Sequence, residues 1–109
     1  MRDDQEKLLD IVEEIKLIEK YLELGRKEYD RSDLIQTWMV KRLENIAEAC
    51  RVLSKEFRLQ HPEIPWEKII AQRNYLIHEY FAIDLEEVWV SVSEDIPVLK
   101  VQIEKLLRK

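Results

Sequence analysis

The stretch AQRNYLIHEY, residues 71–80, has charged side chains at positions where the helical pattern predicts buried apolar residues. An arginine keeps its charge in any protein, so its burial costs several kcal/mol unless carboxylates, backbone carbonyls or a ligand phosphate face it. We therefore predict a helix over this stretch with such a group opposite Arg73. At 100° per residue, Arg73 projects from the middle of one apolar stripe made of Trp66, Ile69, Ile70, Leu76, Ile77 and Tyr80.

Three more polar side chains crowd the same helix end. Asn74 and His78 form an i, i+4 pair just off the stripe, and Tyr80 returns to the face of Arg73 after seven residues. Arginine offers a forked donor for phosphoryl oxygens, asparagine a neutral positioning group, and histidine a proton carrier near neutral pH. One interpretation is a phosphate-handling site. The other is a core helix whose arginine snorkels to its rim and whose histidine is structural.

The spacing of Arg73 and His78 sets a condition on any shared site. Five residues correspond to about 140° around an ideal helix. The two side chains converge only if the helix ends near His78 or if a second subunit contributes.

The composition indicates one helical domain over residues 1–109, with one glycine, three prolines, 38% charged and 46% hydrophobic residues. A chain of this length does not enclose a deep private cleft, so an active site is expected to be shallow or shared. The net charge of −5 argues against a general nucleic-acid coating protein, because non-specific affinity comes from neutralising many phosphates. Local basic sites are still allowed.

Cysteine and histidine are too scarce for a crosslinked or metal-dependent protein. Cys50 is the only cysteine and is expected to act as a small hydrophobe, and the apolar runs are short. We therefore expect a cytosolic protein without disulfides, signal peptide or membrane span. His61 is the only histidine besides His78, and two histidines without further clustered ligands make no metal site. Any chemistry is expected to be independent of metals and cofactors.

Two long helices are predicted in the first half of the chain. The first covers residues 3–24 and is followed by Gly25, where a helix C-terminus favours φ > 0. After a polar link, Asp30 or Ser32 can cap a second helix that runs to about Phe57. Beside its core stripe runs a mixed stripe that is either a partner surface or a broad core face: Trp38, Arg42, Asn45, Ala49 and Val52.

The second half of the chain predicts further helices after the proline-containing loop 58–66. Pro65 fits the first turn of the third helix, and Asp84 with Glu87 can cap the fourth. The apolar phase of this last segment continues through Pro97, so either one helix kinks there or two helices follow end to end with Asp95 capping the second. The short connections favour an all-α, antiparallel bundle of four to five helices.

Four stretches together carry a resemblance to a known family: LENIAEACRVLSKEF, HPEIPWEKI, RNYLIHEYF and DLEEVWVSVSEDIPVLKVQIEKLL. On these stretches, which span nearly the whole chain, the sequence resembles the HEPN superfamily. More narrowly, it resembles the HepT-like toxins encoded beside a minimal nucleotidyltransferase antitoxin. The superfamily motif is an arginine, an optional polar residue and a histidine four to six positions on. It maps to Arg73, Asn74 and His78, and the HepT-like extension adds Tyr80.

The resemblance implies a homodimeric bundle in which two copies of the motif face one another across a cleft. It implies a metal-independent ribonuclease acting on RNA such as tRNA, as the toxin of a type II or VII-like toxin–antitoxin pair. His78 is then the general base or acid, Arg73 stabilises charge on phosphorus, and Asn74 orients the phosphate. The partner nucleotidyltransferase is expected to silence the toxin by AMP transfer to Tyr80.

Two alternatives remain open from the sequence, since not every member of the superfamily cleaves RNA. One is a non-catalytic module that binds a nucleotide or a nucleotidyltransferase and uses Arg73 as a phosphate anchor. The other is a purely structural helical dimer.

Overall fold

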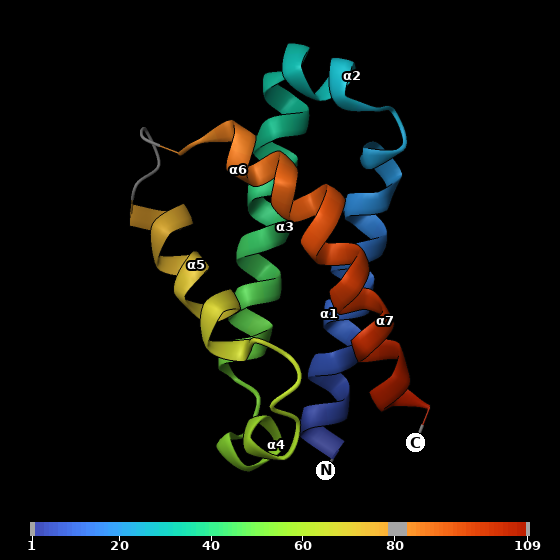
Figure 1. The fold of residues 1–109 in the computed structure, drawn as a ribbon, viewed down its shortest axis with the longest axis vertical. Coiled ribbons are helices and arrows are strands. Elements are labelled where there is room, and N and C mark those ends of the chain that lie inside the picture. The colour runs from blue at the N-terminus through green and yellow to red at the C-terminus, as the bar shows by residue number, and fades with distance from the viewer. Residues whose placement is uncertain (1, 79–82, 109) are drawn as a thin grey trace.

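The computed structural model describes residues 2–78 and 83–108, and every regular element in these ranges is helical. In Figure 1 the long helical segments run alternately up and down, and the short helices lie at opposite ends of the molecule. The predicted all-α antiparallel bundle is thus confirmed. The long segments are α1 (Arg2–Leu22), α3 (Asp33–Arg51), α5 (Trp66–His78) and the run α6 (Leu85–Val90), η2 (Ser91–Asp95) and α7 (Ile96–Leu107). The short helices are α2 (Arg26–Arg31) and α4 (Lys55–Gln60).

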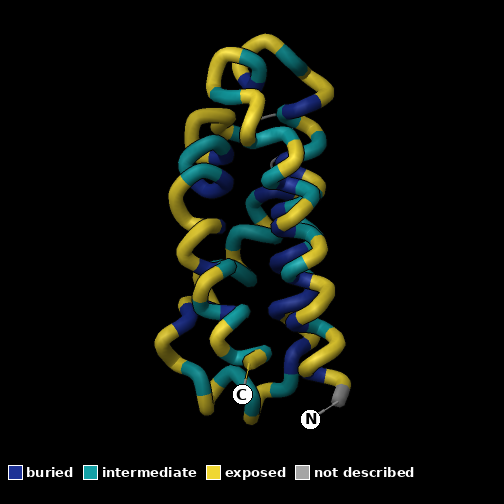
Figure 2. Tube along the Cα trace, turned by 90° about the vertical axis from the view of Figure 1, so that its right-hand side faces the viewer, coloured by how far each residue is buried: buried dark blue, intermediate teal, exposed yellow. Residues whose placement is uncertain are grey.

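Helix α3 is the centre of the bundle, because it packs against α1 on one side and α5 on the other, while α7 packs against α1. The buried residues line the interior of the bundle, and the outward surfaces are exposed (Figure 2). Burying each large aliphatic side chain contributes about 1.5–3 kcal/mol. No helix in the described ranges is long and apolar enough to cross a lipid bilayer. The core includes Ile11, Ile15 and Ile18 of α1, Met39, Leu43, Ile46 and Cys50 of α3, Trp66 and Leu76 of α5, and Val88, Val92, Leu99 and Ile103 of the last segment.

The mixed stripe of α3 is covered by α1. Trp38 Nε1 donates to the Leu17 carbonyl at 2.9 Å, and Asn45 Nδ2 donates to Glu14 Oε1 at 2.9 Å. The Arg42 guanidinium lies 4.6 Å from the centre of the Trp38 ring. Trp38, Arg42 and Asn45 thus form part of a broad core face, whereas Val52, after the end of α3, is 42% exposed.

The second predicted helix is interrupted. Ser32 caps α3 as expected, since its hydroxyl accepts from Ile35 N at 3.1 Å. However, α3 ends at Arg51, so the prediction of one helix reaching Phe57 is wrong. The cause is a tertiary contact: the buried Asp4 carboxylate accepts from Ser54 N at 2.8 Å and from Ser54 Oγ at 2.7 Å. Ser54 then caps α4 by accepting from Phe57 N.

Gly25 ends the first helical segment as predicted. Its φ of 90° lies in the left-handed region, which favours glycine. A Cβ at this position would have no atom within 4 Å, so the backbone angle alone accounts for glycine. The Gly25 carbonyl accepts from Tyr29 N at 3.2 Å and thereby starts α2, a helix that the sequence pattern did not reveal.

The last segment is one continuous helical run. Asp84 caps it as predicted, with Oδ1 accepting from Glu86 N at 2.9 Å and from Glu87 N at 3.4 Å. The π-helical turn η2 then joins α6 to α7 without a break, and Asp95 makes no side-chain cap. The alternative of two separately capped helices is thus excluded, because a π-turn absorbs the change of helical register before Pro97.

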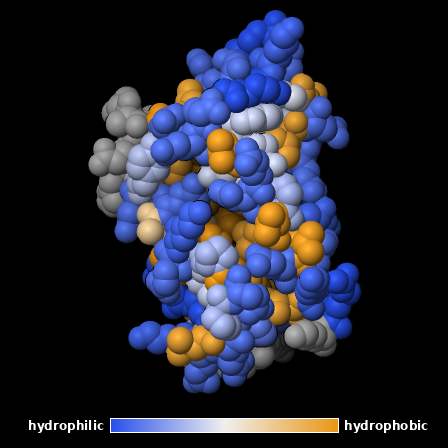
Figure 3. Space-filling view, viewed as in Figure 1, coloured by the Kyte–Doolittle hydropathy of each residue, from blue (hydrophilic) through white to orange (hydrophobic). Residues whose placement is uncertain are grey.

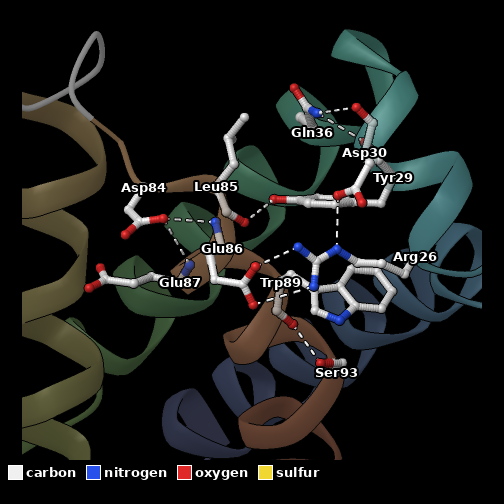
Figure 4. Close-up of polar contacts among 10 residues, drawn as sticks. All are labelled: Arg26, Tyr29, Asp30, Gln36, Asp84, Leu85, Glu86, Glu87, Trp89 and Ser93. Carbon is white, nitrogen blue, oxygen red and sulfur yellow. Dashed lines mark hydrogen bonds and ion pairs between the residues drawn. The ribbon is translucent and has the colours of Figure 1, made fainter.

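A polar cluster fastens the start of α6 to α2 (Figure 4). Tyr29 Oη donates to the Leu85 carbonyl at 2.7 Å, and Arg26 pairs with Glu86 while its guanidinium lies 5.5 Å from the centre of the Trp89 ring. Burial raises the pKa of Tyr29 to about 12. This cluster fixes where the chain re-enters the bundle after the end of α5.

Candidate active site

Arg73 lies midway along α5 and faces a carboxylate of α3. Its Nε is 2.9 Å from Glu48 Oε1, and its side chain is 32% exposed. Trp66 and Leu76 of the same helix are buried. Of the groups expected to face Arg73, a carboxylate is thus present, and partial exposure of the guanidinium leaves room for a ligand.

Glu48 is shared between two arginines. Arg51, one turn further along α3, donates from Nε to Glu48 Oε1 at 3.0 Å and from one terminal nitrogen to Oε2 at 2.6 Å. The hydrogen bonds from Arg51 lower the pKa of Glu48, with the charges of Arg51 and Arg73 adding to the effect against desolvation. Glu48 in turn raises the pKa of Arg51. The carboxylate thus remains ionised between two guanidinium groups at neutral pH.

Sequence reasoning missed Glu48 and Arg51 as parts of this site. Their i, i+3 spacing on α3 is typical of a solvated surface ion pair. No periodicity rule connects a carboxylate of α3 with a guanidinium of α5, because that distance depends on how the two helices pack. The usable signal was the requirement that a carboxylate, backbone carbonyls or a ligand phosphate face Arg73.

The other motif residues occupy the outer and terminal parts of α5. Asn74 is exposed, and His78 is the last residue of the helix. Tyr80 lies outside the described residues. Since α5 is helical from Arg73 through His78, the two positions are on different faces, about 140° apart. Both routes to a shared site, a helix end near His78 and a contribution from a second subunit, stay predictions.

Among its described members, the apolar stripe of α5 differs at one position from the prediction. Ile77 was expected to lie in the core, but it is 37% exposed. Neighbouring residues account for the orientation of the helix: Gln72 Nε2 donates to Ser91 Oγ at 2.9 Å, and Asp84 N donates to Tyr75 Oη at 2.6 Å. These contacts turn that side of α5 toward α6 and η2 and leave Ile77 at the surface, one turn after Arg73.

A large groove between α5 and the last helical segment is a poor site for phosphate. It has a volume of about 690 Å³, and its lining includes Gln72 but neither Arg73 nor Asn74. Apolar side chains appear at the centre of this face, surrounded by hydrophilic ones (Figure 3). One lysine lines it, Lys68, against four carboxylates, which repel phosphate: Glu63, Glu86, Glu87 and Asp95.

No metal centre is evident in the described parts of the chain. There, no group of three or more histidine, cysteine, aspartate or glutamate side chains is arranged to hold a metal ion. Burial raises the pKa of Cys50 to about 12, so this thiol is neither a ligand nor a nucleophile at neutral pH.

The chain is similar to known proteins over most of its length. A family model described as ribonuclease HepT-like matches residues 11–106. The chain belongs to this family. HepT-like relatives include "Probable ribonuclease HepT" of Thermococcus cleftensis, 39% identical over 96% of both chains. "Putative RNase MJ1380" of Methanocaldococcus jannaschii is 36% identical over 94% of this chain and 95% of its own length. "Putative RNase TTE0752" of Caldanaerobacter subterraneus is 34% identical over 85% and 83%, respectively. No solved structure gives a significant match to this HepT-like chain.

Proposed function

We propose that this HepT-like protein is a metal-independent ribonuclease that cleaves tRNA and acts as the toxin of a toxin–antitoxin pair. The observation that carries the proposal is the contact of the Arg73 guanidinium with Glu48 of α3, at the surface of the protein. Arg73 lies on α5, the helix that also bears Asn74 and His78. An arginine in a partly exposed ion pair with one carboxylate retains N–H donors, which are suited to binding a phosphodiester. The family match and the names of the relatives agree with this activity.

The proposed reaction is attack by the RNA 2′-hydroxyl on the adjacent phosphorus. The O2′–P bond forms and the P–O5′ bond breaks, while one proton leaves O2′ and another joins the departing 5′-oxygen. His78 transfers one of these protons, and Arg73 stabilises the negative charge that develops on the phosphoryl oxygens. Asn74 orients the phosphate. The upstream product ends in a 2′,3′-cyclic phosphate, and the downstream product begins with a 5′-hydroxyl.

A homodimer completes the site in this proposal. The positions of Arg73 and His78 are about 140° apart around α5, and in the proposed dimer the second copy supplies the complementary group across the cleft. Two copies of a short chain also enclose a substrate that one copy leaves in solvent.

The activity is tested with purified protein and total tRNA, in buffer containing EDTA. We expect cleavage with cyclic-phosphate ends, resistance of DNA and of RNA methylated at every 2′-oxygen, and loss of cleavage in His78→Ala. Cleavage of the methylated RNA excludes the 2′-hydroxyl mechanism. If the wild-type protein leaves tRNA intact and its expression does not arrest growth, the protein is a binding module and not a ribonuclease.

Regulation by a partner nucleotidyltransferase is part of the same proposal. Tyr80 follows Arg73 by seven residues, which on an unbroken helix corresponds to about 20° and roughly 10 Å. An AMP group on the Tyr80 hydroxyl places a phosphodiester anion beside Arg73 and blocks the RNA backbone. Incubation with the cognate enzyme, ATP and magnesium should add AMP at Tyr80 and abolish cleavage. Tyr80→Phe should retain cleavage and escape silencing, and modification mapped to another residue excludes this switch.

A further inference from the structure

We propose that Arg51 is a second phosphate-binding residue beside Arg73, and that Glu48 positions both guanidinium groups. The inference rests on the proposed ribonuclease function and extends its site from α5 to the last turn of α3. The three side chains meet at one oxygen, Glu48 Oε1, which is 2.9 Å from Arg73 Nε and 3.0 Å from Arg51 Nε. Two cationic side chains from different helices are thereby held within reach of one ligand.

The charge balance of this cluster favours an anion. Two guanidinium groups share one carboxylate, so the cluster of Arg51, Glu48 and Arg73 is net positive in a protein whose net charge is −5. Arg51 is 52% exposed. A guanidinium has five N–H donors, and Arg51 directs Nε and one terminal nitrogen at Glu48, which leaves donors of the other terminal nitrogen for phosphate.

Neighbouring surfaces restrict where an RNA backbone can run. Glu48 also borders a groove of about 420 Å³ between α1 and α3. One lysine, Lys7, lines that groove against three further carboxylates: Asp10, Glu13 and Glu14. The groove between α5 and the last segment is likewise acidic. A polyanion between these two regions therefore meets Arg73 and Arg51 rather than either groove.

Glu48 acts here through orientation rather than through contact with RNA. Long arginine side chains lose rotamer entropy when they bind a ligand. Where a carboxylate already holds the arginine, this entropy is lost before the substrate arrives. The Nε contact of Arg73 fixes one edge of its guanidinium plane, as the forked contact does for Arg51. Glu48 is thus a positioning residue, whereas Arg51 contacts the phosphate.

The role of Arg51 is tested by binding of a mixed-sequence, fully 2′-O-methylated RNA oligonucleotide, which the proposed reaction does not consume. Arg51→Ala should raise its Kd about tenfold, equivalent to about 1.4 kcal/mol. The slope of log Kd against log salt should fall by about 0.7. Arg51→Lys should recover part of the affinity. Arg31→Ala is the matched control, because Arg31 makes an i, i+3 contact of the same 2.6 Å with Glu28 on α2. If Arg51→Ala binds no more weakly than Arg31→Ala, the assignment of Arg51 is overturned.

The role of Glu48 is tested by separating kcat from KM in RNA cleavage. Glu48→Gln keeps the side-chain shape but removes a negative charge, so KM should be unchanged or lower while kcat falls at least about tenfold. Glu28→Gln should change neither constant. If the role of Glu48 is merely structural, neither kcat nor KM changes in a folded variant. An unchanged or increased kcat overturns the positioning role. Thermal unfolding followed by circular dichroism verifies that each variant is folded.

The outcomes distinguish this inference from the proposed function. If the wild-type protein cleaves RNA but Arg51→Ala and Glu48→Gln behave like their controls, only the inference fails. If the wild-type protein binds the methylated RNA through Arg51 but cleaves no RNA, the phosphate site stands and the proposed ribonuclease function fails. Absence of any RNA binding at low salt overturns both.

Discussion

The proposed role of Arg73 depends on the shape of arginine as well as on its charge. Arg73 contacts Glu48 through Nε, and its planar fork retains donors for a phosphate, whereas a lysine ammonium satisfies one acceptor direction at a time. Arg73→Lys should therefore impair RNA cleavage nearly as much as Arg73→Ala, with losses on the order of 10²-fold in kcat. Single-turnover cleavage of tRNA measures the effect.

Stability measurements on the same variants separate a catalytic from a structural arginine. Glu48 keeps its forked contact with Arg51 when Arg73 is removed, so Arg73→Ala should change the free energy of unfolding by less than about 1 kcal/mol. Urea unfolding provides the value. An unfolded Arg73→Ala beside a fully active Arg73→Lys excludes a catalytic role for this side chain.

Tyr29 gives a pH dependence that is independent of the active site. Its pKa is raised to about 12 in the folded protein, because burial disfavours the phenolate. The unfolded chain loses this proton near pH 10, so the stabilisation is complete below about pH 10 and falls as the pH rises toward 12. Tyr29→Phe should cost about 1 kcal/mol at pH 7, since the Leu85 carbonyl loses its donor. In thermal melts between pH 8 and 12, the melting temperature of Tyr29→Phe should fall less with rising pH than that of the wild-type protein. Parallel losses in both proteins exclude Tyr29 as the cause.

The boundary between α3 and α4 is set by a side chain from the other end of the chain. Asp4 is buried and accepts two hydrogen bonds from Ser54, so its removal leaves the backbone N–H and the hydroxyl of Ser54 without this acceptor. Asp4→Ala should lower the free energy of unfolding by about 2–3 kcal/mol, as measured in urea. The exposed neighbour Asp3 is the matched control, and Asp3→Ala should change it by less than about 0.5 kcal/mol. Equal effects of the two variants contradict a specific role for the Asp4–Ser54 contact.

Several elements were predictable from sequence because local chemistry determines them. The apolar faces of α1 and α3, the left-handed Gly25, the Ser32 cap and the Asp84 cap all follow from spacing and residue type. The break after Arg51 was not predictable, because Leu53 and Phe57 continue the apolar phase and the contact that ends the helix comes from Asp4. The Glu48 partner of Arg73 was likewise missed, since it depends on the packing of two helices.

At the scale of the whole molecule, a protein with a net charge of −5 carries a local positive cluster made of Arg51, Glu48 and Arg73. The two grooves carry most of their charge as carboxylates, and the cluster of Arg51, Glu48 and Arg73 lies apart from the larger one. Long-range repulsion between these carboxylates and RNA therefore opposes non-specific binding, while the local positive cluster favours binding of a correctly placed phosphate. This arrangement favours a selective ribonuclease over a general RNA-binding protein.

The dimer proposed for catalysis needs an apolar contact beside the charged cluster, and Ile77 supplies a candidate. It is 37% exposed one turn after Arg73 on α5, so a symmetric contact through this face brings the two motifs together. Ile77→Glu should shift the protein from dimer to monomer in light scattering at micromolar concentration, and the specific activity on tRNA should fall with the dimer fraction. Leu9→Glu is the matched control, because Leu9 is 50% exposed on α1, on the other side of α3 from α5 (Figure 1). A wild-type protein that is monomeric yet cleaves RNA at the same specific activity at every concentration excludes the shared site. Each copy would then provide both Arg73 and His78 by itself, through the end of α5 at His78.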